Sequence, residues 1–327
     1  MKNKMIAFVI LNYNTWEMTI RCVESIFQTC QQKYTIYIVD NGSTNDSYEQ
    51  MEKEYRHHEK VVVIKSENLG YARGNNNGIR QAMKDGYDII TVTNNDVIFL
   101  EDSIDRMYLF LESNKNASVA APYILSPEGV LHNLPTLKKV SNRDYLLHHT
   151  RLEKFLSKES KRQYDQEYNL TGTAIRNEPI PIYKFSGCCF MAKREMLEEV
   201  GLFDENTFLY FEEDIICQKM VNSDYQAYFL PDSKIVHHHG LTTGKDNLFV
   251  DTEMLKSEMY FLSKYNRMNF WSMLMIYIDR AITSIMKIIK KRYHNASIKD
   301  YMVFLGKTWK HFIKNTRQRN DKNTNIE

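Results

Sequence analysis

Ile89-Ile-Thr-Val-Thr-Asn-Asn-Asp96 is an apolar run that ends in two amides and a carboxylate. It is rich in β-branched residues, which favours a buried strand. In open α/β sheets, ligands bind outside the carboxyl ends of the strands. The stretch therefore predicts a central strand that delivers Asp96 to a binding site. A carboxylate shortly before Glu101 is equally consistent with the start of a helix.

Strand-like runs and helical patterns alternate on both sides of this stretch. Three apolar runs precede it, at Met5–Leu11, Tyr34–Val39 and Val61–Ile64. A helical pattern from Glu101 to about Ser113 and a strand near Val119–Ile124 follow it. Alternation at this spacing predicts an α/β fold with a mostly parallel, Rossmann-like sheet flanked by helices.

Shorter elements are expected beyond residue 180. The sequence predicts a strand at Phe185–Ala192, a short helix at Lys193–Val200 and another at Glu212–Asn222. Two short strands, Tyr225–Leu230 and Ile235–Val236, are expected after them. These elements extend the same α/β domain.

Composition excludes several classes of protein. A net charge of +2 over 327 residues does not indicate a nucleic-acid binder. The five cysteines fit no zinc or disulfide framework, which favours a reducing, cytoplasmic location. The first apolar run is too short for a signal peptide and lacks a cleavage site of small residues, so we interpret it as a strand.

The chain divides into an α/β domain over residues 1–245, a helical region over 246–313 and a polar tail over 314–327, which we expect to be disordered. Residues 126–180 are polar and are expected to form an insertion in this domain. Phe270–Arg292 has a broad apolar stripe, with Asp279, Thr283 and Lys287 on the other side. This segment is either an in-plane amphipathic helix at a membrane or a helix packed on the protein's core or on a second subunit in a homodimer.

Two acidic positions are candidate ligand-binding residues. Asp40 follows the second strand and can accept the N3–H of uracil or thymine, or can close an Asx-turn. Asp96 can hold a divalent cation that is shared with phosphates. His237 follows the last strand and can contact a metal or a phosphate, or can be a packing residue.

A second acidic cluster, Glu212-Glu213-Asp214, opens a predicted helix. Acidic residues complement the helix dipole there, but the aromatic residues before them suit a general base with a raised pKa. The Gly70–Gly78 segment is read as a loop in which Arg73 can meet a phosphate. It is not a dinucleotide-binding fingerprint.

Taken in order, eight short pieces of this sequence resemble the family 2 inverting glycosyltransferases, especially the rhamnosyltransferase-like branch of bacterial surface-polysaccharide synthesis. The pieces are Val9–Asn14, Ile38–Ser43, Glu67–Asn76, Asn94–Val97, Gly187–Met191, Val200–Glu205, Phe208–Asp214 and Val236–Gly240. Each is weak alone, but their order and spacing over roughly residues 4–245 are specific.

The resemblance implies a GT-A-type fold and transfer of a sugar from a UDP- or dTDP-sugar to a hydroxyl of a glycan or lipid-linked acceptor. It implies a cytoplasmic enzyme, either free or peripheral at the inner face of the cell membrane, with the 126–180 insertion on the acceptor side. The implied nucleotide-sugar contacts are Asn12, Asp40, Asn68, Arg73, Asn75 and Asn95. Asp96 and His237 would lie at a Mg²⁺ or Mn²⁺ site or at the diphosphate.

The catalytic base implied by the resemblance is Glu213, or Asp214 if the motif shifts by one residue. Asn94 stands where the family often has the first Asp of its metal motif. A sugar-phosphate nucleotidyltransferase and a non-catalytic nucleotide-sugar-binding module are the alternative functions. The former should carry a Gly-rich basic loop after the first strand, which Asn12–Trp16 does not resemble.

Overall fold

The computed structural model describes residues 6–132, 134–170, 178–221, 223–238, 247–290, 293 and 297–323. His239, Gly240, Lys291 and Arg292, which belong to segments interpreted above, lie outside these residues. The strands are β1 (Ile6–Asn12), β2 (Tyr34–Asn41), β3 (Val61–Ser66), β4 (Ile89–Asn94), β5 (Val97–Phe99), β6 (Ala117–Leu125), β7 (Ile180–Ile182), β8 (Cys189–Lys193) and β9 (Gln226–His237). The helices of the α/β part are α1 (Trp16–Thr29), α2 (Ser47–Tyr55), α3 (Tyr71–Lys84), α4 (Ser103–Ser113), α7 (Arg194–Val200) and α8 (Glu212–Met220).

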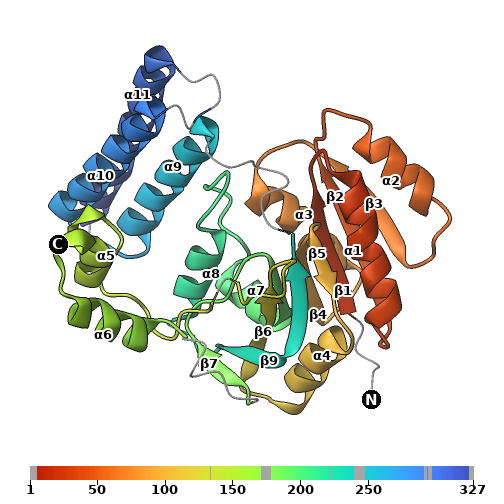
Figure 1. The fold of residues 1–327 in the computed structure, drawn as a ribbon. Coiled ribbons are helices and arrows are strands. Elements are labelled where there is room, and N and C mark those ends of the chain that lie inside the picture. Colours follow the sequence, from red (N-terminus) through yellow and green to blue (C-terminus); the bar gives the residue numbers. More distant parts are fainter. Residues whose placement is uncertain are drawn as a thin grey trace.

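The strands form one mixed sheet in the order β3-β2-β1-β4-β8-β6-β9-β5, and β7 pairs with β9 (Figure 1). β1 to β4 are mutually parallel, and β6 is parallel to β9. β8 is antiparallel to both of its neighbours, β4 and β6. The predicted mostly parallel α/β sheet with flanking helices is therefore confirmed.

The sequence predicted the strand that forms β8 but not its place between β4 and β6. An apolar run such as Cys189-Phe-Met-Ala192 suits any interior strand, so the sequence pattern does not specify its neighbours. β9 corrects one expectation, since the two short strands predicted there are one strand. Its register shifts by a bulge at Pro231–Ser233, and this polar interruption looked like a break in the sequence.

Buried side chains lie on both faces of the sheet because alternate strand residues point in opposite directions. On one face, Phe8 and Ile10 pack with the apolar sides of α1, α2 and α4. On the other face, Ala7 and Val9 pack with α3, α7 and α8. The core therefore fixes the carboxyl ends of β1, β2 and β4 side by side at one edge.

The Gly70–Gly78 segment is not a loop, because α3 begins at Tyr71. Its glycines allow the helix to lie against the sheet. A Cβ on Gly78 would lie 2.5 Å from Val9 Cγ1, and one on Gly74 would lie 2.4 Å from Leu11 Cδ1. The close approach explains the glycine spacing that suggested a loop.

The insertion forms α5 (Asn142–His148), a 3-10 helix η1 (Arg151–Phe155) and α6 (Lys158–Tyr168). The chain then ends in α9 (Leu248–Lys264), α10 (Phe270–Ile289) and α11 (Ile298–Asn323), which lie together away from β1 to β3 (Figure 1). α11 thus runs through most of the segment expected to be disordered, because its Lys, Arg and Gln residues are good helix formers. Within the described residues, no helix combines the length and apolarity that are needed to cross a membrane.

Candidate active site

Asn12, Asp40 and Asn95 meet at the carboxyl ends of β1, β2 and β4. Asn12 pairs with Asp40 in the parallel ladder, and its Nδ2 donates to Asp40 Oδ2 at 3.0 Å. Asn95 Nδ2 lies 3.3 Å from Asn12 Oδ1 and also donates to the hydroxyl of Thr19. All four side chains are buried. The network joins the carboxyl ends of these three strands into one buried polar cluster.

The Asp40 carboxylate is held by its own turn. The backbone N–H of Ser43 donates to Oδ1 at 3.1 Å, and the Ser43 hydroxyl donates to Oδ2 at 2.5 Å. This local bond resembles the turn alternative left open by the sequence, but it reaches three residues on and not the two of an Asx-turn. It does not exhaust the carboxylate, because Oδ1 accepts one hydrogen bond in these contacts and has a second lone pair.

The other predicted nucleotide contacts are more dispersed. Asn68 Oδ1 accepts from Asn41 Nδ2 and from the N–H of Gly70, both at 3.3 Å, so it joins the end of β2 to the start of α3. Arg73 is half-exposed and lies 3.5 Å from Glu205. Asn75 is buried and donates back to the carbonyl of Tyr71. The contacts of Arg73 and Asn75 therefore do not connect them with Asp40.

Asp96 and His237 are brought together by the pairing of β5 with β9. His237 lies opposite Val97, and its Nε2 is 3.1 Å from Asp96 Oδ1. Both side chains are almost fully buried. Burial opposes an imidazolium, but the carboxylate of Asp96 and the thiol of Cys188 raise the pKa of His237 to about 10. His237 is therefore a cation beside Asp96 in this arrangement.

These two side chains can hold a divalent cation only with help from a ligand. The described residues contain no group of three or more His, Cys, Asp and Glu side chains placed to bind a metal. Magnesium sites often use one or two carboxylates and complete their shell with substrate phosphates. The buried carboxylate of Asp96 fits that arrangement. Neutral His237 would be a second ligand, whereas protonated His237 has no free lone pair and can contact a phosphate instead.

Glu212, Glu213 and Asp214 form the first turn of α8, after two residues with positive φ, Tyr210 and Phe211. Their environments differ. Glu212 is buried, and burial together with Glu213 raises its pKa to about 8. Burial and Asp214 also raise the pKa of Glu213, although Lys184 acts in the opposite direction. The Asp214 carboxylate is ion-paired with Lys184 at 2.9 Å.

Glu213 faces the segment before β8. A Cβ on Gly187 would lie 3.3 Å from Glu213 Oε2, so the glycine leaves space for the carboxylate. The carbonyl of Gly187 in turn lies 2.9 Å from the hydroxyl of Tyr71, which is also 2.9 Å from Asn94 Oδ1. Tyr71 therefore connects the region of Glu213 with Asn94, the last residue of β4, two residues before Asp96.

Tyr71 and Lys184 were not predicted as site residues. Burial, and then the carboxylates of Glu212 and Glu213, raise the pKa of Tyr71. Tyr71 lies within the Glu67–Asn76 piece, which was the one signal that could have identified it. Lys184 stands outside all eight pieces of the resemblance, and no local pattern marks it.

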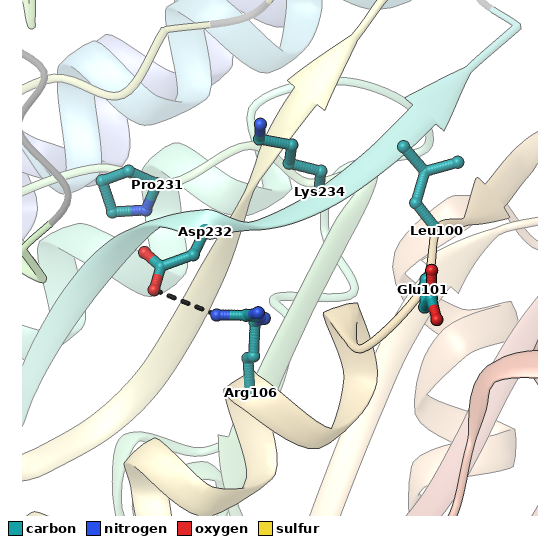
Figure 2. Close-up of a pocket in the computed structure, with 6 residues that line it drawn as sticks. All are labelled: Leu100, Glu101, Arg106, Pro231, Asp232 and Lys234. Carbon is teal, nitrogen blue, oxygen red and sulfur yellow. Dashed lines mark hydrogen bonds and ion pairs between the residues drawn. The ribbon is translucent and has the colours of Figure 1, made fainter.

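A surface cleft of about 430 Å³ lies apart from these contacts, beside the bulge of β9 (Figure 2). It is lined by Leu100, Glu101, Arg106, Pro231, Asp232 and Lys234. Arg106 and Asp232 form an ion pair of 3.2 Å across it. None of the predicted site residues lines this cleft.

Comparison with known proteins gives distant relatives that share much of this chain. The chain is 23% identical over 255 residues to N-acetylglucosaminyl-diphospho-decaprenol L-rhamnosyltransferase of Mycobacterium tuberculosis, covering 74% of this chain and 78% of the relative. It is also 23% identical over 242 residues to the dTDP-rhamnosyl transferase RfbF of Shigella flexneri, covering 73% and 70%. Both are similar proteins whose names describe their own activities.

The fold also resembles a solved glycosyltransferase structure. The crystal structure of GalNAc-T7 with UDP, GalNAc and Mn²⁺ matches with a TM-score of 0.60 and 15% identity, over 93% of this chain and 56% of that one. At this identity the match supports the GT-A fold alone. The family model for glycosyl transferase family 2 matches residues 7–201, which is more than half of the chain. The protein is therefore a glycosyltransferase and belongs to glycosyltransferase family 2.

Proposed function

We propose that the protein is an inverting enzyme that moves a sugar from a UDP- or dTDP-sugar to a hydroxyl of a glycan or lipid-linked acceptor. The observation that carries this proposal is the position of the Tyr71 hydroxyl, which lies 2.9 Å from the carbonyl of Gly187, beside Glu213, and 2.9 Å from Asn94 Oδ1, two residues before Asp96. This supports a carboxylate with a raised pKa near the predicted diphosphate site. A general base and a leaving-group site must be neighbours for direct displacement.

The nucleotide end of the donor is assigned to the Asn12–Asp40–Asn95 network. The free lone pair of Asp40 Oδ1 can accept the N3–H of uracil or thymine, which cytosine lacks. Asn68 borders the same edge at the start of α3. Arg73 and Asn75 would enter the site only if the ligand displaced their present contacts.

The diphosphate is assigned to Asp96 and His237. Asp96 would hold Mg²⁺ or Mn²⁺, which neutralises charge on a leaving diphosphate when it is bound. His237 would join that metal site only as a neutral imidazole, because an imidazolium has no lone pair for a metal. As an imidazolium it would instead donate to the diphosphate itself. That positive group would partly offset the weaker metal site expected with the Asn94 amide in place of a second carboxylate.

Glu213 is the preferred base and Asp214 the alternative. The base accepts the proton of the acceptor hydroxyl, and the oxygen forms a bond to the anomeric carbon from the face opposite the diphosphate. The bond from that carbon to the diphosphate breaks, and its electron pair leaves with the phosphate oxygen. Asp214 already compensates the charge of Lys184, whereas burial of Glu213 favours proton uptake at higher pH.

The names of the relatives indicate which substrates to test first. One relative is a dTDP-rhamnosyl transferase, and another acts on a sugar linked to a diphospholipid. We therefore place dTDP-rhamnose and a lipid-linked diphosphosugar first in a panel with UDP- and GDP-sugars. Transfer would be measured with and without Mg²⁺ or Mn²⁺.

The decisive variants are Glu213→Gln and Asp214→Asn. Loss of a general base costs on the order of 10² to 10⁴ in rate, so Glu213→Gln should reduce transfer by that factor while donor binding persists. Glu195→Gln, in the exposed first turn of α7, is the matched control and should retain transfer. Full transfer by both Glu213→Gln and Asp214→Asn would overturn the proposed mechanism, and donor binding with no transfer to any acceptor would favour a binding module.

A further inference from the structure

The outward face of α10 is apolar along its whole length. Every exposed side chain of this helix is apolar, and the full set is Phe270, Trp271, Met275, Ile278, Ile282, Met286 and Ile289. Trp271 and Ile289, at opposite ends of the row, are 72% and 73% exposed. Contiguous exposed apolar rows of this length mark interaction sites in soluble domains.

The inward face of α10 combines apolar side chains with charged ones, so the outward face is the more uniformly apolar of the two. Asp279 is buried and ion-paired with Arg151 at 2.8 Å. Arg280 bonds to the buried Glu258 at 2.8 Å, and Lys287 bonds to Asp251 at 2.9 Å. These contacts fix the rotation of α10, so the apolar row cannot turn inward without breaking them.

The apolar face continues onto α11, which packs beside α10. The rings of Tyr277 and Trp309 lie 5.4 Å apart, and Tyr301 donates to the carbonyl of Ala281. The exposed apolar residues of α11 are Ile298, Met302, Val303 and Trp309. α9 lies between these two helices and the α/β domain, so the face is on the outside of the molecule (Figure 1).

The exposed charges of these two helices have mostly one sign. The exposed lysines are Lys290, Lys299, Lys307, Lys310 and Lys314. Over residues 270–290 and 297–316, the acidic side chains are Asp279, which is buried, and Asp300, which accepts hydrogen bonds from Ser297. An apolar row flanked by lysines is complementary to a surface with negative headgroups above an apolar layer.

We propose that the α10–α11 face binds in the plane of an anionic lipid bilayer. A second copy of the chain fits this face less well, because a symmetric contact would bring the lysines of one face toward those of the other with little acidic compensation. The inference rests on exposure and charge, and it does not depend on the proposed donor or base. Its test needs no sugar nucleotide.

The first experiment uses the unmodified full chain. In flotation, the protein should rise with phosphatidylcholine vesicles that contain phosphatidylglycerol and should rise much less with pure phosphatidylcholine. High salt should weaken the binding. Brominated acyl chains should quench tryptophan emission, since Trp271 and Trp309 lie on the proposed face. Absence of flotation with the anionic vesicles would overturn the proposal.

The second experiment compares two doubly charged variants. Ile278→Glu with Ile282→Glu alters the α10 row, whereas Val62→Glu with Leu109→Glu places the same charge at exposed apolar sites of the α/β domain. The α10 variant should bind anionic vesicles at least about tenfold more weakly, and the control should bind like the unmodified chain. Equal flotation of the two variants would contradict membrane binding by the α10 row.

Light scattering without vesicles tests the second-copy alternative. The alternative would be correct if the unmodified chain were a dimer that did not float with vesicles, and if the Ile278→Glu/Ile282→Glu variant were a monomer. That result would show that another subunit covers this face. Melting temperatures verify that both variants fold, and the quenching experiment on the unmodified chain remains decisive if either does not.

Discussion

Glu213 and Asp214 are neighbours in the chain, yet their partners give them different chemistry. Asp214 is paired with Lys184, whereas Glu213 lies against the backbone of Gly187 and has a raised pKa. The sequence could place both residues in the first turn of a helix. It could not show which of the two is the base, because Lys184, which pairs with Asp214 alone, lies 30 residues away in a segment without a motif.

Two substitutions should therefore move the pH profile in opposite directions. A base works when deprotonated, so kcat/KM should fall as pH decreases through the raised pKa of Glu213. Asp214→Asn removes a neighbouring negative charge and should shift this acid limb to lower pH. Lys184→Met removes a positive charge and should shift it to higher pH. Shifts in the same direction would contradict the assignment of Glu213.

Asp40 allows a second test at the residue scale. Asp40→Asn replaces an acceptor with an amide beside three donor groups from Asn12 and Ser43. Losing a charge-assisted bond costs about 1.5–3 kcal/mol, so binding of UDP and dTDP should weaken roughly 10- to 100-fold by calorimetry. Asp46→Asn, exposed in the same turn region, should bind normally. Unchanged affinity of Asp40→Asn would exclude its contact with the base.

At the scale of elements, the alternating pattern predicted β1 to β4, α1 and the acidic start of α8 well. The pattern could not predict strand neighbours where both faces of a strand are buried. Such a strand is apolar throughout, so its sequence does not show which strands it pairs with. The position of β8 between β4 and β6 was therefore not predicted. Glycine also misled the prediction, because Gly74 and Gly78 serve close helix–sheet packing and not a loop.

The packing of α3 predicts a matched pair of glycine substitutions. Gly78→Ala would place a methyl group 2.5 Å from Val9 Cγ1, so overpacking should reduce the free energy of unfolding by about 1–3 kcal/mol. Gly306→Ala, in the open interior of α11, meets no neighbour within 4 Å and should be neutral or stabilising by up to about 1 kcal/mol. Urea denaturation measures both. Equal effects would show that the contact with Val9 is not restrictive.

Across the whole molecule, α9 joins the C-terminal helices to the loop before α8. Asp204 in that loop accepts hydrogen bonds from Tyr260 and Lys264 of α9 and from Tyr265, which follows the helix. The hydroxyl of Ser257 also donates to the carbonyl of Leu209. The residues before Glu213 are therefore positioned by a helix that the sequence placed in a separate region, because long-range hydrogen bonds leave no local pattern.

Asp204→Asn should test this connection. Burial opposes the charge of Asp204, but hydrogen bonds from Tyr265 and Asn206 lower its pKa below the usual value. Its stabilising contribution is therefore present above the unfolded pKa and is lost as pH falls toward the lowered folded pKa. The variant should lose about 3 kcal/mol at neutral pH, a cost that shrinks in acid. Asp232→Asn, which breaks an exposed pair, should cost at most about 1 kcal/mol, and an equal loss would refute the argument.

The antiparallel strand β8 also has a kinetic consequence. Ile89 pairs with Ile6 on one side and with Lys193 on the other. β4 therefore acquires its second neighbour only after residues 95–188, 94 in all, are brought back to it. Closing so long a loop is entropically slow relative to the nearby β1–β2 pairing. During refolding, pulsed hydrogen exchange should therefore show amide protection in β1 and β2 before β8. Simultaneous protection of all three strands would mean that the sheet assembles in one concerted step.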